Sequence, residues 1–180
     1  MGLVLLLGGC STVASWTNSF IGGSDNSEPP APLIDIADPV PMKKSWDTSG
    51  GVGHDKQFVN LVPSIYEGQL FIADRKGRVV SLDAETGKKN WEVKTEAAVS
   101  GGPWVGSDVV LVGTSNAEVL ALSAYDGTLL WRTEVSSEVL SVPQVDIDKV
   151  IVQTSDGNIT ALGLDSGEQL WICLLYTSDA

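Results

Sequence analysis

The sequence predicts an all-β protein built of stacked four-stranded antiparallel units, and three observations lead to this prediction. A Gly-x-x-x-Trp pattern recurs every 40 residues and ends at Trp91, Trp131 and Trp171. Prolines and leucines keep the same interval without an insertion, at positions 63, 103 and 143 and at positions 82, 122 and 162. Short runs of Val, Ile and Leu, separated by Gly, Asp, Asn or Ser, fill each unit, and such runs are typical of strands.

The local pattern separates the two architectures that share a repeat of this length. A period of about 40 residues is typical of four-stranded propeller blades and of helical-pair solenoids. Helices would need apolar residues at i, i+3, i+4 and i+7 over about ten or more positions, and no window of the repeat has them. We therefore expect a β-propeller of four-stranded antiparallel blades.

Each unit contains four apolar runs, which we expect to form one blade. The expected strands are 59–65, 70–73, 79–82 and 90–93 in the first unit, 99–105, 110–113, 119–122 and 130–133 in the second, and 139–145, 150–153, 159–162 and 170 onward in the third. Turn pairs such as Glu67-Gly68 and Asp156-Gly157 separate them, and Gly allows the positive φ of tight hairpins. The first strand of each blade should line a crowded central channel, which suits the small residues Ser100, Gly101 and Gly102.

The recurring glycine and tryptophan are the expected contacts between blades. A glycine supplies the turn between the third and fourth strands, and the tryptophan begins the outermost strand. The large ring can lie across the turn of the adjacent blade, where its N–H can reach a backbone carbonyl. The alternative is a ligand-stacking platform, but a residue that recurs in every unit more often serves the architecture. The expected docking residues are Gly87, Trp91, Gly127, Trp131, Gly167 and Trp171.

The repeat resembles that of pyrroloquinoline-quinone-type propellers, which are typically eight-bladed. Within that group the stretches WDTS (46–49), ADRKG (73–77), EVLSVP (138–143) and TSDG (154–157) look most like the BamB family of outer-membrane protein assembly factors. The resemblance implies a periplasmic lipoprotein that scaffolds the machine inserting β-barrels, by binding the periplasmic domains of its central barrel protein. It also implies that the main partner contacts lie beyond the third blade, so the partner-binding residues are unknown.

The amino-terminal stretch MGLVLLLGGC reads as the end of a lipoprotein signal peptide, over residues 1–9. Leu-x-Gly-Cys is a lipobox, in which the Cys10 thiol accepts a diacylglycerol and the new amino terminus is acylated. The basic residues that open a signal peptide are missing, so we expect that Met1 is not the true start. Ser11 favours sorting to the outer membrane, on its periplasmic face. Residues 10–45, rich in Ser, Asn, Gly, Pro and Asp, should be a flexible tether.

The length leaves room for three blades, in residues 46–171. Eight blades of this period would need some 320 residues, so we expect the chain to be incomplete. Trp46 resembles the outermost strand of a last blade, supplied by the amino-terminal side to close the ring. The ending CLLYTSDA resembles translated adapter sequence, and we treat residues 172–180 as a non-native tail.

Composition argues against several classes of function. The net charge of −12 argues against nucleic-acid binding, which would show a basic stripe, and leaves membrane attachment to the lipid. The single histidine, His54, lies in the glycine-rich loop GGVGHD, and clustered Cys and His ligands for zinc are lacking. Asp74, Asp83 and Asp156 recur near turns, where aspartate commonly accepts backbone hydrogen bonds.

We expect a non-enzymatic protein without catalytic residues, metal or cofactor, and the resemblance implies a scaffold for outer-membrane protein assembly. Two alternatives stay open. One is a part of a quinone-dependent periplasmic dehydrogenase, which would need calcium ligands and a catalytic aspartate. The other is a propeller lipoprotein that binds peptide or polysaccharide.

Overall fold

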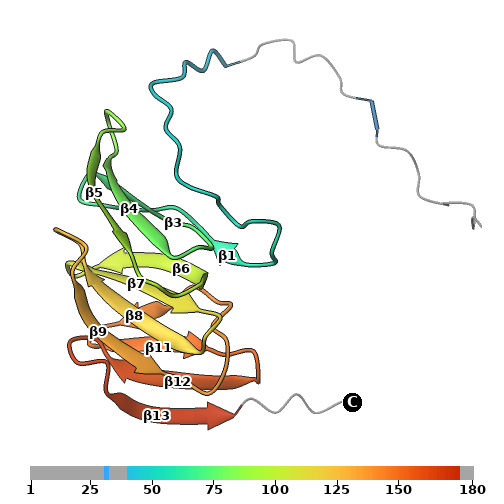
Figure 1. Ribbon diagram of the computed structural model, residues 1–180, viewed down its shortest axis with the longest axis vertical. Coiled ribbons are helices and arrows are strands. Elements are labelled where there is room, and N and C mark those ends of the chain that lie inside the picture. Colours follow the sequence, from blue (N-terminus) through green and yellow to red (C-terminus); the bar gives the residue numbers. More distant parts are fainter. Residues whose placement is uncertain (1–30, 33–39, 175–180) are drawn as a thin grey trace, which may run out of the picture. The chain divides into compact units, whose positions relative to one another are not determined.

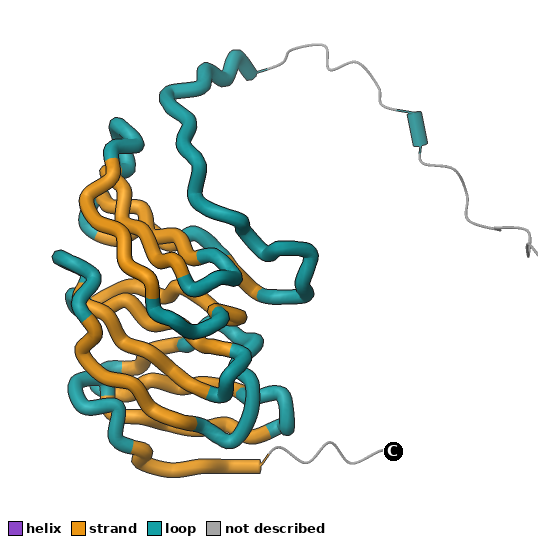
Figure 2. Tube along the Cα trace, in the orientation of Figure 1, coloured by secondary structure: helices purple, strands orange, loops and turns teal. Residues whose placement is uncertain are grey.

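The described part of the chain is built of strands. The computed structural model describes residues 31–32 and 40–174, in which there are thirteen strands and no helix (Figure 2). The chain divides into two compact units, Met1–Met42 and Lys43–Ala180, and every described strand belongs to the second. The expected signal sequence, the expected lipidation site Cys10 and most of the expected tether lie outside the described residues.

Three antiparallel sheets of four consecutive strands follow one another along the chain, as the sequence predicts (Figure 1). The first blade is β2 (Ser64–Tyr66), β3 (Gln69–Ala73), β4 (Arg78–Asp83) and β5 (Lys89–Lys94). The second is β6 (Val99–Gly106), β7 (Val109–Thr114), β8 (Glu118–Ser123) and β9 (Leu129–Glu134). The third is β10 (Gln144–Asp146), β11 (Lys149–Gln153), β12 (Asn158–Gly163) and β13 (Gln169–Leu174). The last strand thus runs three residues beyond the expected end of the blade at Trp171.

The expected first strand, 59–65, is two strands in the structure. Its first part, β1 (Asn60–Leu61), pairs in parallel with β6 of the second blade, where Asn60 faces Gly101. Val62 continues this contact by donating its N–H to the Gly102 carbonyl at 3.0 Å. Pro63 follows and has no N–H to give, so the chain leaves the second blade there and enters β2 of the first.

The expected strand 139–145 is also shorter, because only Gln144–Asp146 joins the third sheet. The residues before it bond to both blades: the Glu138 carbonyl accepts the Ser155 N–H of the third blade at 2.9 Å, while Val139 bonds to the second blade. The Val139 N–H donates to the Thr114 carbonyl at 3.1 Å, and the Val139 carbonyl accepts the Ser100 hydroxyl at 2.8 Å. These bonds join the inner strands of neighbouring blades.

The hydrophobic core lies between blades rather than within them. Every residue of β7 is buried, because the two faces of the second blade each meet another blade. Val110 and Val112 belong to a cluster with Phe71 of the first blade. Val109 and Leu111 belong to a second cluster with residues of the third blade. Fully burying a Val or Leu side chain contributes about 1.5–3 kcal/mol, so stacking stabilises each meander.

Small residues let the inner strands approach closely, as the sequence predicts for this region. Ser100, Gly101 and Gly102 are all buried. A Cβ atom at Gly101 would overlap the Ser141 carbonyl oxygen of the third blade, and one at Gly113 would overlap the Val139 side chain. The backbone at Ser141 cannot shift without disturbing the contact between blades.

We predict that Gly101→Ala destabilises the fold by about 2 kcal/mol, because an added methyl group overpacks a site bounded by backbone. Gly163→Ala is the matched control on β12: its Cβ would meet the Ser166 Oγ at 2.9 Å and no backbone atom closer than 3.9 Å. The measurement is the free energy of unfolding in urea. Equal losses in the two variants would show that inner-strand crowding does not limit the fold.

Candidate functional site

The tryptophan that ends a repeat lies against a turn of the next blade. On β5, the Trp91 indole N–H donates to the Ala124 carbonyl of the second blade at 2.9 Å. On β9, the Trp131 indole N–H donates to the Leu164 carbonyl of the third blade at 2.7 Å. Both carbonyls belong to the turn between the third and fourth strands of the next blade, so each indole ties one blade to its neighbour.

Glycine in the receiving turn makes room for the ring. Gly127 and Gly167 have φ angles of 76° and 69°, in the left-handed region that favours glycine. A Cβ atom at Gly127 would lie 2.8 Å from the Trp91 ring, and one at Gly167 would lie 2.6 Å from the Trp131 ring. The glycine therefore serves both the turn and the contact.

Trp46 makes the same contact with the first blade. Its indole N–H donates to the Ala84 carbonyl at 3.1 Å, and a Cβ atom at Gly87 would lie 2.6 Å from its ring. The sequence places Gly87 in the repeated column but does not reveal its partner, because Trp46 lies 45 positions before Trp91 rather than 40. The segment around Trp46, expected to be a closing strand, is not a strand in the structure.

Five of the six expected docking residues thus take part in three contacts, Trp91 with Gly127, Trp131 with Gly167, and Gly87 with Trp46, which was not among them. Trp171 occupies the same place on β13 but is 44% exposed, against 8% for Trp131. In residues 40–174 no following turn covers it. The role of these residues in holding blades together stays a prediction, which a substitution below tests.

Carboxylates hold the receiving turns in shape. Asp83 accepts the Thr86 N–H at 2.7 Å and the Thr86 hydroxyl at 2.6 Å, and these bonds, chiefly the hydroxyl, lower the Asp83 pKa. In the second blade Asp126 accepts the Thr128 N–H and hydroxyl, and the bond from the N–H is the main cause of its lowered pKa. The expectation that aspartates near turns bind backbone is confirmed at Asp74, Asp83 and Asp156.

Asp74 is a buried carboxylate at the other end of the first blade. It is 2% exposed and accepts the N–H groups of Lys76, Arg78 and Val52 at 2.9–3.2 Å, together with Arg78 Nε at 3.3 Å. Burial alone would raise the Asp74 pKa, but these hydrogen bonds outweigh it and the pKa is lowered. Asp74 therefore remains ionised and fastens the glycine-rich loop to the turn between β3 and β4.

In the other blades, a threonine takes the place of Asp74 in this turn. Thr114 and Thr154 occupy the corresponding positions 40 and 80 residues later. Thr114 Oγ1 accepts the N–H groups of Asn116 and Glu118, both at 3.2 Å. The charge at Asp74 belongs to the first blade alone, because only there does a loop donate from outside the repeat.

The described residues offer little support for histidine or metal chemistry. His54 is exposed, and its Nδ1 accepts the Lys56 N–H at 3.0 Å within the loop. Among residues 31–32 and 40–174, no group of three or more His, Cys, Asp and Glu side chains could hold a metal ion. None of the described residues forms a helix of the length and hydrophobicity that crossing a membrane requires.

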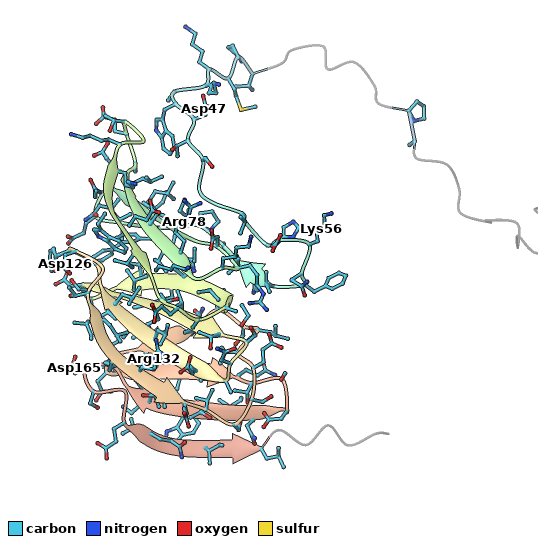
Figure 3. All side chains as sticks on the ribbon, in the orientation of Figure 1. Asp47, Lys56, Arg78, Asp126, Arg132 and Asp165 are labelled. Carbon is cyan, nitrogen blue, oxygen red and sulfur yellow. The ribbon has the colours of Figure 1, made fainter. Side chains whose placement is uncertain are left out.

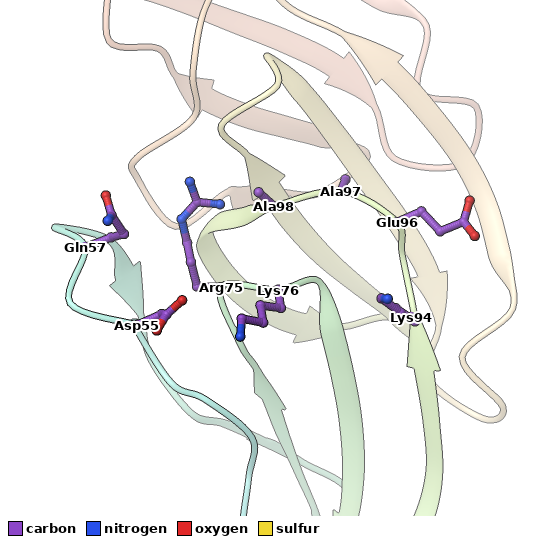
Figure 4. A pocket seen from close by; sticks show the side chains of 8 residues that line it. All are labelled: Asp55, Gln57, Arg75, Lys76, Lys94, Glu96, Ala97 and Ala98. Carbon is purple, nitrogen blue, oxygen red and sulfur yellow. The ribbon is translucent and has the colours of Figure 1, made fainter.

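A patch of basic side chains lies close to the Asp74 turn. Arg75 and Lys76 follow Asp74 in this turn, and Lys94 ends β5. They line an open depression of about 800 Å³ together with Asp55, Gln57, Glu96, Ala97 and Ala98 (Figure 4). The sequence alone does not reveal this patch, because its members come from separate segments.

Comparisons with known proteins point to one family. The family of outer membrane protein assembly factor BamB matches residues 45–124 and 75–180. BamB of Xanthomonas campestris is 33% identical over 132 residues, which are 66% of this chain and 32% of that protein. The crystal structure of BamB from Moraxella catarrhalis superposes with a TM-score of 0.59 at 28% identity, over 64% of this chain and 35% of that one.

A fold likeness extends to quinone enzymes. A europium-containing methanol dehydrogenase superposes with a TM-score of 0.57 at 18% identity, over 62% of this chain and 24% of that one. At this identity the likeness shows the fold alone. The chain spans about a third of the length of the BamB relatives it matches.

We predict that Trp131→Phe lowers the free energy of unfolding by about 1–3 kcal/mol, because the buried Leu164 carbonyl loses its donor. Trp171→Phe is the matched control, since its exposed side chain has no such bond in the described chain, and the expected change is within about 0.5 kcal/mol. Urea unfolding of both variants gives the comparison. Similar losses at the two positions would argue against docking as the role of Trp131.

The lowered pKa of Asp74 predicts a pH-dependent contribution to stability. A carboxyl with a folded-state pKa below its ordinary value of 3.8 stabilises the fold above that value, and the effect is lost as the pH falls below it. Asp74→Asn should therefore cost about 2 kcal/mol at pH 7, and its difference from the wild type should shrink below pH 3.8. The free energies of unfolding of the wild type and of Asp74→Asn, measured at about pH 7, 5 and 3, test this. Asp55→Asn, at an exposed carboxyl, is the control. A difference that stays constant down to pH 3 would mean that the charge of Asp74 is not its source.

Proposed function

Because the chain belongs to the BamB family of outer membrane protein assembly factors, we propose that it is a non-enzymatic scaffold in outer-membrane protein assembly. The family match over residues 45–124 and 75–180 is the observation that carries this proposal. The structure is consistent with it, since the stacked blades present a series of turns on a rigid base. The partner that we propose is the central barrel protein of the assembly machine, contacted through its periplasmic domains.

Attachment to the membrane is proposed to be through lipid on Cys10. The sequence support is the lipobox around Leu7, Gly9 and Cys10 and the polar, proline-containing stretch that follows. A diacylglycerol together with an acyl chain exceeds the marginal membrane affinity of a single chain. With Ser11 after the cysteine, the proposed location is the outer membrane, with the propeller on its periplasmic side.

The enzymatic alternative receives no independent support. The dehydrogenase likeness lies at 18% identity and carries no argument about activity. Three described aspartates each accept a backbone hydrogen bond within their own turn: Asp74, Asp83 and Asp156. The binding of peptide or polysaccharide by an unrelated lipoprotein would leave the family match unexplained.

The proposal predicts two linked results in a cell that makes the tagged protein from its complete reading frame. The wild type should fractionate with the outer membrane and recover the central barrel protein from a mild-detergent extract. Cys10→Ala should lose labelling by radioactive palmitate and move to the soluble periplasmic fraction, because the acylated thiol is gone.

Ser45→Ala serves as a control with an intact lipobox, since the Ser45 side chain is exposed. Recovery of no barrel-assembly protein above a tag-only background would contradict the scaffold proposal. Labelling that persists in Cys10→Ala would contradict the anchor while leaving the scaffold proposal standing.

A further inference from the structure

The basic patch formed by Arg75, Lys76 and Lys94 is exceptional in an acidic protein. The chain has 11 basic and 23 acidic residues. At the opposite ends of the blades, the turns carry exposed carboxylates, among them Asp126 and Asp165, which lie along one edge of successive sheets (Figure 3). Lys56, in the loop beside the basic patch, lies away from that edge (Figure 3).

The repeat shows that the patch is not required by the architecture. Arg75 and Lys76 correspond to Ser115 and Asn116 in the second blade. In the third blade the same positions hold Ser155 and Asp156. Lys94 corresponds to Glu134 of the second blade, which has the opposite charge. The same turn thus folds without any of the three cations.

The three cations have no partners within the described part of the chain. Arg78 is neutralised by Asp74 and Glu92, but none of Arg75, Lys76 and Lys94 has a carboxylate oxygen within 4.0 Å among residues 40–174. The Arg75 Nε is buried and has no hydrogen-bond partner there. A buried donor without a partner costs free energy.

The depression around these side chains is open and mixed in character. Arg75 and Lys76 occupy its middle, while the Glu96 carboxylate points away from them (Figure 4). Gln57 adds an amide, and buried Ala97 gives part of the floor an apolar surface. Lys76 and Lys94 also line a second open depression with Arg78 and Val93, so the patch is continuous across the end of the first blade.

We propose that the basic patch is a docking surface for an acidic segment of a partner polypeptide. The Arg75 guanidinium is suited to a carboxylate in two-pronged geometry, and the lysines supply point charges beside it. A polypeptide fits the mixed lining, because the Gln57 amide and the apolar Ala97 lie beside the cations and can meet its backbone and side chains. The inference rests on the proposed function in taking the partner to be a protein.

The test uses the purified protein and a fluorescein-labelled hexaglutamate peptide, with hexaglutamine as the uncharged probe, followed by fluorescence anisotropy. We expect binding of hexaglutamate alone, weakened by salt because exposed charges are screened. Arg75→Ser with Lys76→Asn should raise the Kd at least about tenfold, since two of three cations are lost. These are the residues of the second blade, so the turn should fold normally.

The control is Lys88→Ser with Lys149→Gln, which removes the same charge at the opposite ends of the blades and should change the Kd less than about twofold. Equal losses in the two double variants, or no peptide binding by the wild type, would overturn the proposal. So would binding to phosphatidylglycerol vesicles that depends on Arg75 while hexaglutamate does not bind.

The outcome is separable from that of the proposed function. If the patch binds the peptide but the protein recovers no assembly machine, the scaffold proposal fails and the docking surface stands. If the machine is recovered equally by the wild type and by Arg75→Ser with Lys76→Asn, and the peptide does not bind, the docking surface fails alone.

Discussion

The contact between a tryptophan and the glycine turn of the next blade is the constraint on which the architecture depends. It combines a hydrogen bond across the blade boundary with a ring that fits only where the neighbour lacks a Cβ atom. The turn that receives it is fixed by aspartate and threonine side chains. Because these features recur at one interval, the blades meet in one register, and the apolar faces of the second blade are covered on both sides.

The blades could be predicted because they are encoded locally and repeatedly. The alternation of apolar runs with Gly and Asp turns determines each hairpin, and three copies confirm one another. The strand β1 could not be predicted in the same way, because Asn60 and Leu61 pair with the next blade and only the position of Pro63 hints at a break. The segment around Trp46 is predicted to be a strand, but in the structure Trp46 contacts the turn at Gly87, and the local sequence does not reveal this contact.

Candidate interaction residues were predicted less completely than the fold. The aspartates were expected to bind backbone, but the reach of Asp74 to Val52 depends on a loop outside the repeat. Arg75, Lys76 and Lys94 become one patch only when the end of β5 lies beside the turn between β3 and β4. Comparing corresponding positions in the three blades separates what the architecture needs, such as the positive φ shared by Gly77, Ala117 and Gly157, from what one blade adds. In a scaffold, we expect the residues that contact a partner to be among those that one blade adds.

The central claim is that tryptophan and glycine act as one unit across the blade boundary, and a double-mutant cycle between Trp131 and Gly167 tests it most directly. The free energy of unfolding is measured for Trp131→Ala, Gly167→Ala, the double variant and the wild type. Gly167→Ala should cost at least about 1 kcal/mol less in the Trp131→Ala background than in the wild type, because the clash with the ring disappears while the strain of the turn remains. Losses that simply add would contradict the claim.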